Sequence, residues 1–202
     1  MFRFAVKRLV PLLAGLTVLS ACSSPEIPAD SFFRLDAGRS QTVLQAPKLS
    51  GTLTVNRFAA EGPVGDRPIL FAEQATPFQL QQYHYSYWSE PPGVMLADAL
   101  TDFLRSANAA ETVVFAELRL PATFYVNGRI LRFERLLGDG RPQAIVSLEL
   151  SLERASDGRT LMLQTYSAHE TAAGDAMTDT VLAFRRALNS AYGRFLQDLS
   201  AL

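Results

Sequence analysis

The sequence predicts an α/β fold, a layered sandwich in which a mixed, largely antiparallel sheet is covered by two main helices. Two observations lead to this prediction: runs of strict two-residue alternation, and two stretches with apolar residues at helical spacing. The clearest alternation lies between positions 144 and 154, where one face is apolar and the other polar. About 180 residues beyond the N-terminal segment suit a single domain with its own core. The apolar face consists of Ala144, Val146, Leu148, Leu150 and Leu152.

The first half of the chain predicts four strands separated by Gly- and Pro-containing loops. The second strand has the strongest pattern, because Leu53 and Val55 alternate with threonine and asparagine. The fourth is rich in β-forming aromatic residues. The four ranges are 30–36, 52–58, 69–74 and 76–88.

The period then changes to that of a helix, which we expect over residues 92–107. Ser89 is the expected N-cap, and Pro91 or Pro92 fits the first turn, where no N–H donor is needed. Asn108 is the expected stop. The apolar stripe consists of Val94, Leu96, Leu100, Phe103, Leu104 and Ala107.

The second half predicts four more strands and a long C-terminal helix. Gly128 lies where the apolar phase of the second of these strands shifts, which predicts a β-bulge there. The last three strands follow one another through short turns, including Asp157-Gly158, and predict an antiparallel meander. The helix carries apolar residues every three or four positions, and this stripe must face the sheet. The ranges are 111–117, 123–136, 144–154 and 160–172 for the strands and 174–202 for the helix.

The N-terminus resembles a bacterial lipoprotein signal. Basic residues precede an apolar run of about a dozen residues, which is shorter than a membrane-spanning helix needs. Small residues then lead to Cys22, the only cysteine in the chain. We therefore expect a signal peptide at residues 1–21, a lipidated tether at 22–29 with acyl chains on Cys22, and one domain at 30–202. The residues after Cys22 are serines rather than aspartate, which by resemblance to known sorting patterns favours the outer membrane, facing the periplasm.

Composition excludes several classes of protein and of stabilisation. A single cysteine allows no intramolecular disulfide, so the core alone must stabilise the fold. The formal net charge is −1, and the basic residues form no stripe, which argues against nucleic acid as a partner.

The sequence offers few groups for catalysis or metal binding. The only histidines are His84 and His169, and neither lies in a metal-ligand or nucleophile motif. Asp98 and Asp102 are four residues apart on the predicted first helix and fit its solvated face. We therefore predict neither an enzyme, nor a cofactor, nor a metal site.

One block of residues carries a family resemblance. Its most specific part is the sequence Trp-Ser-Glu-Pro-Pro that begins at Trp88. With the lipobox, it resembles the ABC-type transport auxiliary lipoprotein family, the PqiC-like lipoproteins. The matching positions are Arg57, Asp66-Arg67-Pro68-Ile69, Phe71, Tyr83, Trp88, Glu90-Pro91-Pro92 and Met95-Leu96.

The resemblance implies a role in transport between membranes. Such lipoproteins accompany an ABC permease and ATPase together with an MCE (mammalian cell entry) domain protein, and these systems move lipids or other hydrophobic molecules. It also implies a lipoprotein that docks on the MCE assembly and forms a homo-oligomer to match its ring. A lipid-binding carrier domain of the envelope is the alternative.

The aromatic stretch before the two prolines allows two interpretations. Trp88, Glu90, Pro91 and Pro92 predict a structural joint that turns a strand into a helix, because a residue before proline favours extended backbone. Strict alternation would place Tyr83, Tyr85 and Tyr87 on one strand face. A partly exposed tyrosine row of this kind is typical of a partner-binding surface.

Overall fold

The structure is a computed structural model that describes residues 28–202. Cys22 and the signal peptide lie outside the described residues. The order of the main elements is β-β-β-β-α-β-β-β-β-α, as the sequence predicts. The strands are β1 (Ser31–Phe33), β2 (Leu49–Val55), β3 (Pro68–Glu73), β4 (Thr76–Trp88), β5 (Ala110–Phe115), β6 (Phe124–Leu137), β7 (Gln143–Arg154) and β8 (Arg159–Thr171). The helices are α1 (Pro92–Ser106) and α2 (Met177–Ala201), with short 3₁₀ turns η1 (Gly62–Gly65) and η2 (Ala116–Leu118).

The sheet is mixed, and the prediction that it is largely antiparallel is not confirmed. Within the described residues, four of the seven strand pairs are parallel and three are antiparallel. The antiparallel ladders β6–β7 and β7–β8 are the longest, as the meander pattern indicated. The parallel pairs join strands far apart in the sequence, and local alternation carries no information about such partners.

The long strand β6 organises the sheet. On one side it pairs with β7 along its length. On the other side its first residues pair with β2 and its last residues with β3, both in parallel. The sheet therefore divides into two arms, one with β2 and β5 and the other with β3, β4 and β1.

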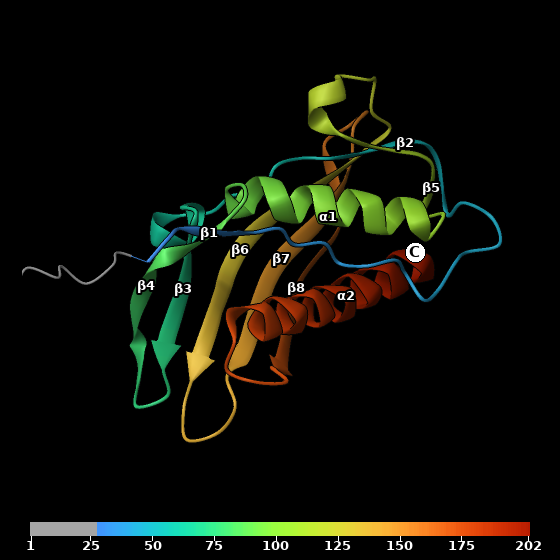
Figure 1. Cartoon of the computed structure of the whole chain (residues 1–202). Coiled ribbons are helices and arrows are strands. Elements are labelled where there is room, and N and C mark those ends of the chain that lie inside the picture. The colour runs from blue at the N-terminus through green and yellow to red at the C-terminus, as the bar shows by residue number, and fades with distance from the viewer. Residues whose placement is uncertain (1–27) are drawn as a thin grey trace, which may run out of the picture.

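Both helices cover the same face of the curled sheet (Figure 1). Helix α2 packs against β7 and β8, and α1 packs against β5 and β2. The apolar stripe of α2 is buried there, with Phe184, Leu188, Tyr192 and Phe195 excluded from solvent. No helix among residues 28–202 is long and apolar enough to cross a membrane.

Gly128 does not form the predicted bulge. The irregularity in the β6–β7 ladder lies between Ile130 and Arg132, and Gly128 pairs in regular register with Leu150. Glycine is required there for a different reason: a Cβ atom would lie 2.4 Å from the buried ring of Phe58. The glycine within this strand therefore marks the close approach of another chain segment rather than a bulge.

The segment between β1 and β2 runs as a strap across the two helices (Figure 1). Asn189 of α2 donates hydrogen bonds to the carbonyls of Ala37 and Arg39, at 2.9 and 3.1 Å. The N–H of Ser40 donates to the hydroxyl of Ser106 at the end of α1, at 2.9 Å. The strap therefore connects the N-terminal segment to both helices.

Candidate functional site

Trp88 ends β4 and anchors the candidate site in the core. Its side chain is 1% exposed. The indole stacks on Phe133 of β6, with centroids 5.1 Å apart, and meets Phe184 of α2 edge-on at 5.4 Å. Its main chain is held as well, because its N–H donates to the carbonyl of Arg67, whose guanidinium donates back to the Trp88 carbonyl. Trp88 thus packs the end of β4 against the long strand β6 and against helix α2.

The proline corner starts α1, but the N-cap is Pro91 rather than the predicted Ser89. The carbonyl of Pro91 accepts the N–H groups of Val94 and Met95 at 3.0 and 3.1 Å, and no side chain caps the helix. Proline can fill this place because its extended backbone is preset and the first-turn N–H groups have no helical partner. Pro92 is buried, whereas Glu90 and Pro91 are exposed.

The start of α1 is fixed to the loop after β2. The N–H of Phe58 donates to the carbonyl of Gly93 at 3.0 Å. A Cβ atom on Gly93 would lie 2.4 Å from the Phe58 carbonyl oxygen, so the two backbones approach as closely as only glycine allows. Phe58 therefore connects the proline corner to Gly128 of β6.

The prediction that the three tyrosines share one face is wrong. The β3–β4 ladder pairs Pro68 with Tyr87 and Leu70 with Gln82, so the single residue between these pairs on β3 opposes the four residues 83–86 of β4. Three extra residues in β4 form a bulge, and an odd number reverses the alternation. Tyr83 therefore lies on the helix side of the sheet, and Tyr87 lies on the opposite side.

Tyr83 is part of the packed interior rather than a free surface. Its ring lies 4.6 Å from that of Phe71, and its hydroxyl accepts a hydrogen bond from Arg135 at 3.0 Å. Arg135 is only 7% exposed, and it also donates to the carbonyl of Asp175 before α2. The sequence analysis did not single out Arg135, although its alternation with Phe133 placed it on the buried face.

Tyr85 and Tyr87 form the accessible part of the aromatic strand. Tyr85 is exposed, and Tyr87 is half-buried against Phe32 of β1, with ring centroids 5.6 Å apart. The guanidinium of Arg67 lies 5.2 Å from the centre of the Phe32 ring, within cation–π range. We call Phe32, Arg67, Tyr87 and the exposed Tyr85, which lies two residues before Tyr87 on β4, the aromatic cluster; it carries one positive charge. Phe32 and Arg67 were not predicted as parts of it, because β1 pairs with β4 across more than 50 residues.

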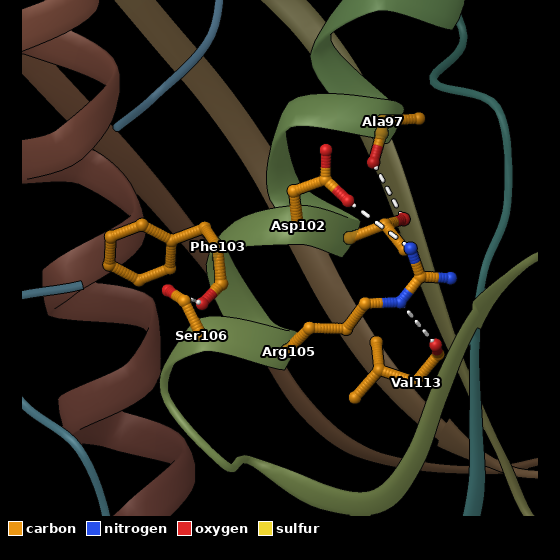
Figure 2. A network of polar contacts seen from close by, with 7 residues as sticks. Ala97, Asp102, Phe103, Arg105, Ser106 and Val113 are labelled. Carbon is orange, nitrogen blue, oxygen red and sulfur yellow. Dashed lines mark hydrogen bonds and ion pairs between the residues drawn. The ribbon is translucent and has the colours of Figure 1, made fainter. Parts of the chain in front are cut away.

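Acidic side chains line the exposed side of the joint and α1. Burial raises the pKa of the Asp98 carboxyl, and the nearby charges of Glu90, Glu117 and Asp102 raise it further. Figure 2 shows Asp102 beside Arg105, 3.2 Å apart, while Arg105 also donates to the carbonyl of Val113 at 2.7 Å. Asp102 therefore lies on the solvated face of the helix, as the spacing predicted.

A hollow of about 640 Å³ lies between the strap and the two helices. Five of its lining residues are charged, and two ion pairs stand at its walls: Asp36 with Arg185 at 2.8 Å, and Asp102 with Arg105. Such a lining suits water or polar groups better than an acyl chain. The charged residues are Asp36, Arg39, Asp102, Arg105 and Arg185.

The histidines are not brought together with other catalytic groups. His84 belongs to β4, and His169 belongs to β8 and pairs with Ile145 of β7. In the part of the chain that the structure describes, no group of three His, Cys, Asp or Glu side chains could hold a metal ion.

Three comparisons relate the chain to known proteins. The model of a family described as ABC-type transport auxiliary lipoprotein component matches residues 39–193. The fold is similar to a crystal structure of a DUF330 family protein from Xanthomonas campestris, at a TM-score of 0.70 and 20% identity, covering 82% of this chain and 92% of that one. It is also similar to the PelC dodecamer from Paraburkholderia phytofirmans, at a TM-score of 0.50 and 13% identity, covering 80% and 95%. No curated protein matches. At these identities the structural likeness establishes the fold alone.

Proposed function

Because the chain belongs to the family of ABC-type transport auxiliary lipoprotein components, we propose that it is the anchored accessory protein of such a transport system. The observation that carries the proposal is the family match across residues 39–193, which includes most of the strap, the joint, all of α1 and α2 as far as Gly193. The finer proposal is that the system contains an MCE-domain protein with an ABC permease and ATPase. It would move lipids or other hydrophobic molecules between the inner and outer membranes.

The anchor in this proposal is the lipid attached to Cys22 after removal of residues 1–21. Several acyl chains on one residue hold a protein durably at a bilayer, whereas one chain holds it only weakly. The serines after Cys22 support the outer membrane as its location, with the domain facing the periplasm. The tether of residues 22–29 reaches at most about 25 Å, so the domain works close to its membrane.

The aromatic cluster is the proposed docking surface for the MCE partner. Tyrosine and arginine contribute strongly to protein interfaces, because they bury much area at a small cost in rotamer freedom. Tyr85 and Tyr87 are accessible here, and Phe32 and Arg67 hold the surface in place. Tyr83 contributes by fixing β4 against Arg135 rather than by touching a partner.

A homo-oligomer is part of the proposal. The PelC structure, which has a similar fold, is a dodecamer, and this supports an oligomer for the present chain. Light scattering after size-exclusion chromatography of the lipoprotein in detergent tests it. A monomer at micromolar concentration would contradict this part of the proposal.

The adaptor role is preferred to the lipid-carrier alternative because of the charged lining of the hollow at the strap. The core beneath the helices is filled by side chains, among them Trp88, Phe133 and Phe184. Mass spectrometry of the purified domain under native conditions discriminates the two roles. Phospholipid retained at one molecule per chain would favour the carrier.

Capture of the MCE partner tests the adaptor role directly. We expect the wild-type lipoprotein to retain the MCE protein of the proposed transport system, and the double variant Tyr85→Ala, Tyr87→Ala to lose most of this binding. Leu163→Ala is the matched control, because Leu163 is an exposed apolar residue on β8, at the other edge of the sheet. If the wild-type chain binds no MCE protein, the proposal of an MCE partner is wrong. If the double variant binds as well as the wild type, only the proposed position of the docking surface is wrong.

A further inference from the structure

The β4 side of the β3–β4 hairpin tip is exposed and uncharged, and it carries two large apolar side chains. Phe78 is 101% exposed, so it has no contact that shields it from solvent. Leu80 is also exposed, and Pro77 and Ala75 flank the turn. Residues 74–83 contain no Asp, Glu, Lys or Arg. Packing within the domain does not account for Phe78, whose side chain is fully exposed on β4 two residues from the exposed Leu80.

The tip lies at the end of the sheet where two hairpins project together. The N–H of Gln74 donates to the carbonyl of Leu137 at 2.7 Å, which joins the β3–β4 hairpin to the β6–β7 hairpin. Figure 1 shows both hairpins extending beyond the helix layer at this end. Charges lie beside both turns, because Glu73 directly precedes the β3–β4 turn and lines a shared hollow with Asp139 of the β6–β7 turn. The uncharged stretch that carries Phe78 therefore begins after Glu73 and continues along β4.

The direction of β1 relates the tip to the lipid anchor. Strand β1 is parallel to β4, with Ser31 opposite Ser86. The chain before Ser31 therefore enters from the side of β4 on which the hairpin tip lies. From Ser86 back to Phe78 the strand spans about 26 Å. The residues from Cys22 to Ser31 reach about 30 Å when extended.

We propose that the β3–β4 hairpin tip is a second membrane contact, with Phe78 inserted among the lipids of the bilayer that holds the acyl chains of Cys22. The proposal rests on the lipid attachment proposed above and adds to it a fixed orientation of the domain. Aromatic side chains favour the membrane interface, where a ring leaves water without the cost of moving a charge. The anchor and the tip would then lie in one membrane plane.

The chemistry of the tip favours a zwitterionic bilayer surface over an anionic one. No basic residue within 74–83 would attract anionic headgroups, and Glu73 and Asp139 beside the two turns would be repelled by them. Insertion should therefore depend on apolar contact and respond little to salt. A docking protein or a second copy of the chain would instead protect the tip in the absence of accessible lipid.

Tryptophan fluorescence in vesicles tests the proposal. The acylated full chain carrying Phe78→Trp is reconstituted into phosphatidylethanolamine–phosphatidylcholine vesicles whose acyl chains are brominated. The matched control is Leu163→Trp, at a position 57% exposed on β8. Trp88 is buried in every variant, so the wild-type chain supplies the background.

We expect the tip tryptophan to be quenched at least about twofold more strongly than the control, with a blue-shifted emission that 0.5 M salt leaves in place. Equal quenching at the two positions overturns the proposal. So does a blue shift without quenching, which would place the tip against protein. Capture of the MCE partner by Phe78→Ser is measured in parallel. If Phe78→Ser captures the partner normally and Phe78→Trp is quenched, the membrane contact of the tip is supported. If Phe78→Ser captures the partner normally but Phe78→Trp is not quenched, the membrane contact is wrong and the adaptor role still stands.

Discussion

The two halves of strand β4 have opposite environments. From Tyr83 to Trp88 the strand is fixed to the core, to β1 and to the start of α1. From Thr76 to Gln82 it is almost wholly exposed, and Phe78 at its far end touches nothing that shields it. The exposed half has one aromatic residue and three glutamines, whereas the packed half has three tyrosines and a tryptophan. The difference indicates that the half from Tyr83 to Trp88 maintains the fold while leaving Tyr85 and part of Tyr87 accessible, whereas the half from Thr76 to Gln82 takes little part in packing.

The largest effect is expected at the packed end of the strand. Trp88→Ala removes the indole from between Phe133 and Phe184 and leaves a cavity in the core. We expect the free energy of unfolding to fall by about 3–5 kcal/mol, measured by urea denaturation. Trp88→Phe keeps an aromatic ring and should cost distinctly less. A loss below about 1 kcal/mol for Trp88→Ala would contradict the statement that this half of β4 is fixed to the core.

The next effect tests how closely the joint is fixed to the sheet. Gly128→Ala places a methyl group 2.4 Å from the ring of Phe58, which itself is held by Gly93. We expect a loss of about 1–3 kcal/mol in the free energy of unfolding, as for overpacking of a core. Gly140→Ala is the control, because a Cβ atom there meets nothing within 4 Å. In a Phe58→Leu background the penalty should shrink, and an unchanged penalty would indicate strain of another origin.

A smaller effect separates the two tyrosines that the sequence treated as equivalent. Tyr83→Phe removes the hydroxyl that accepts from the buried Arg135, so we expect a loss of about 1–2 kcal/mol. Tyr85→Phe changes an exposed residue and should stay within about 0.5 kcal/mol. Thermal unfolding of the two variants side by side measures the difference. Equal values would show that the bulge in β4 does not divide the strand as described.

The elements could be predicted from the sequence because their signals are local. Alternation located the strands, and the two prolines located the start of α1 at Pro92, where the helix begins. The N-cap was assigned to Ser89 because its side chain suits a cap. The structure uses the backbone of Pro91 instead, which no side-chain preference reveals.

The parts that could not be predicted depend on pairing between distant segments. The parallel partners of β6 and the neighbour of β4 are set by tertiary packing, and the predicted antiparallel character was therefore overstated. The bulge in β4 is visible only in its register with β3. Because the sequence does not reveal this bulge, strict alternation predicted Tyr83, Tyr85 and Tyr87 on one face. Arg135 could have been found by extending the apolar phase of β6 from Phe133.

The smallest effect on stability is expected at the exposed end of the strand. Phe78→Ser removes a side chain with no shielding contact, so the free energy of unfolding should change by no more than about 0.5 kcal/mol. Urea denaturation of the detergent-solubilised lipoprotein measures this, with Trp88→Ala as the opposite extreme. Stability equal to wild type, together with a lost contact at a bilayer, would show that the residue is retained for binding rather than folding. A loss above about 1.5 kcal/mol would mean that the tip folds back onto the domain, and the contrast between the two halves of β4 would then fail.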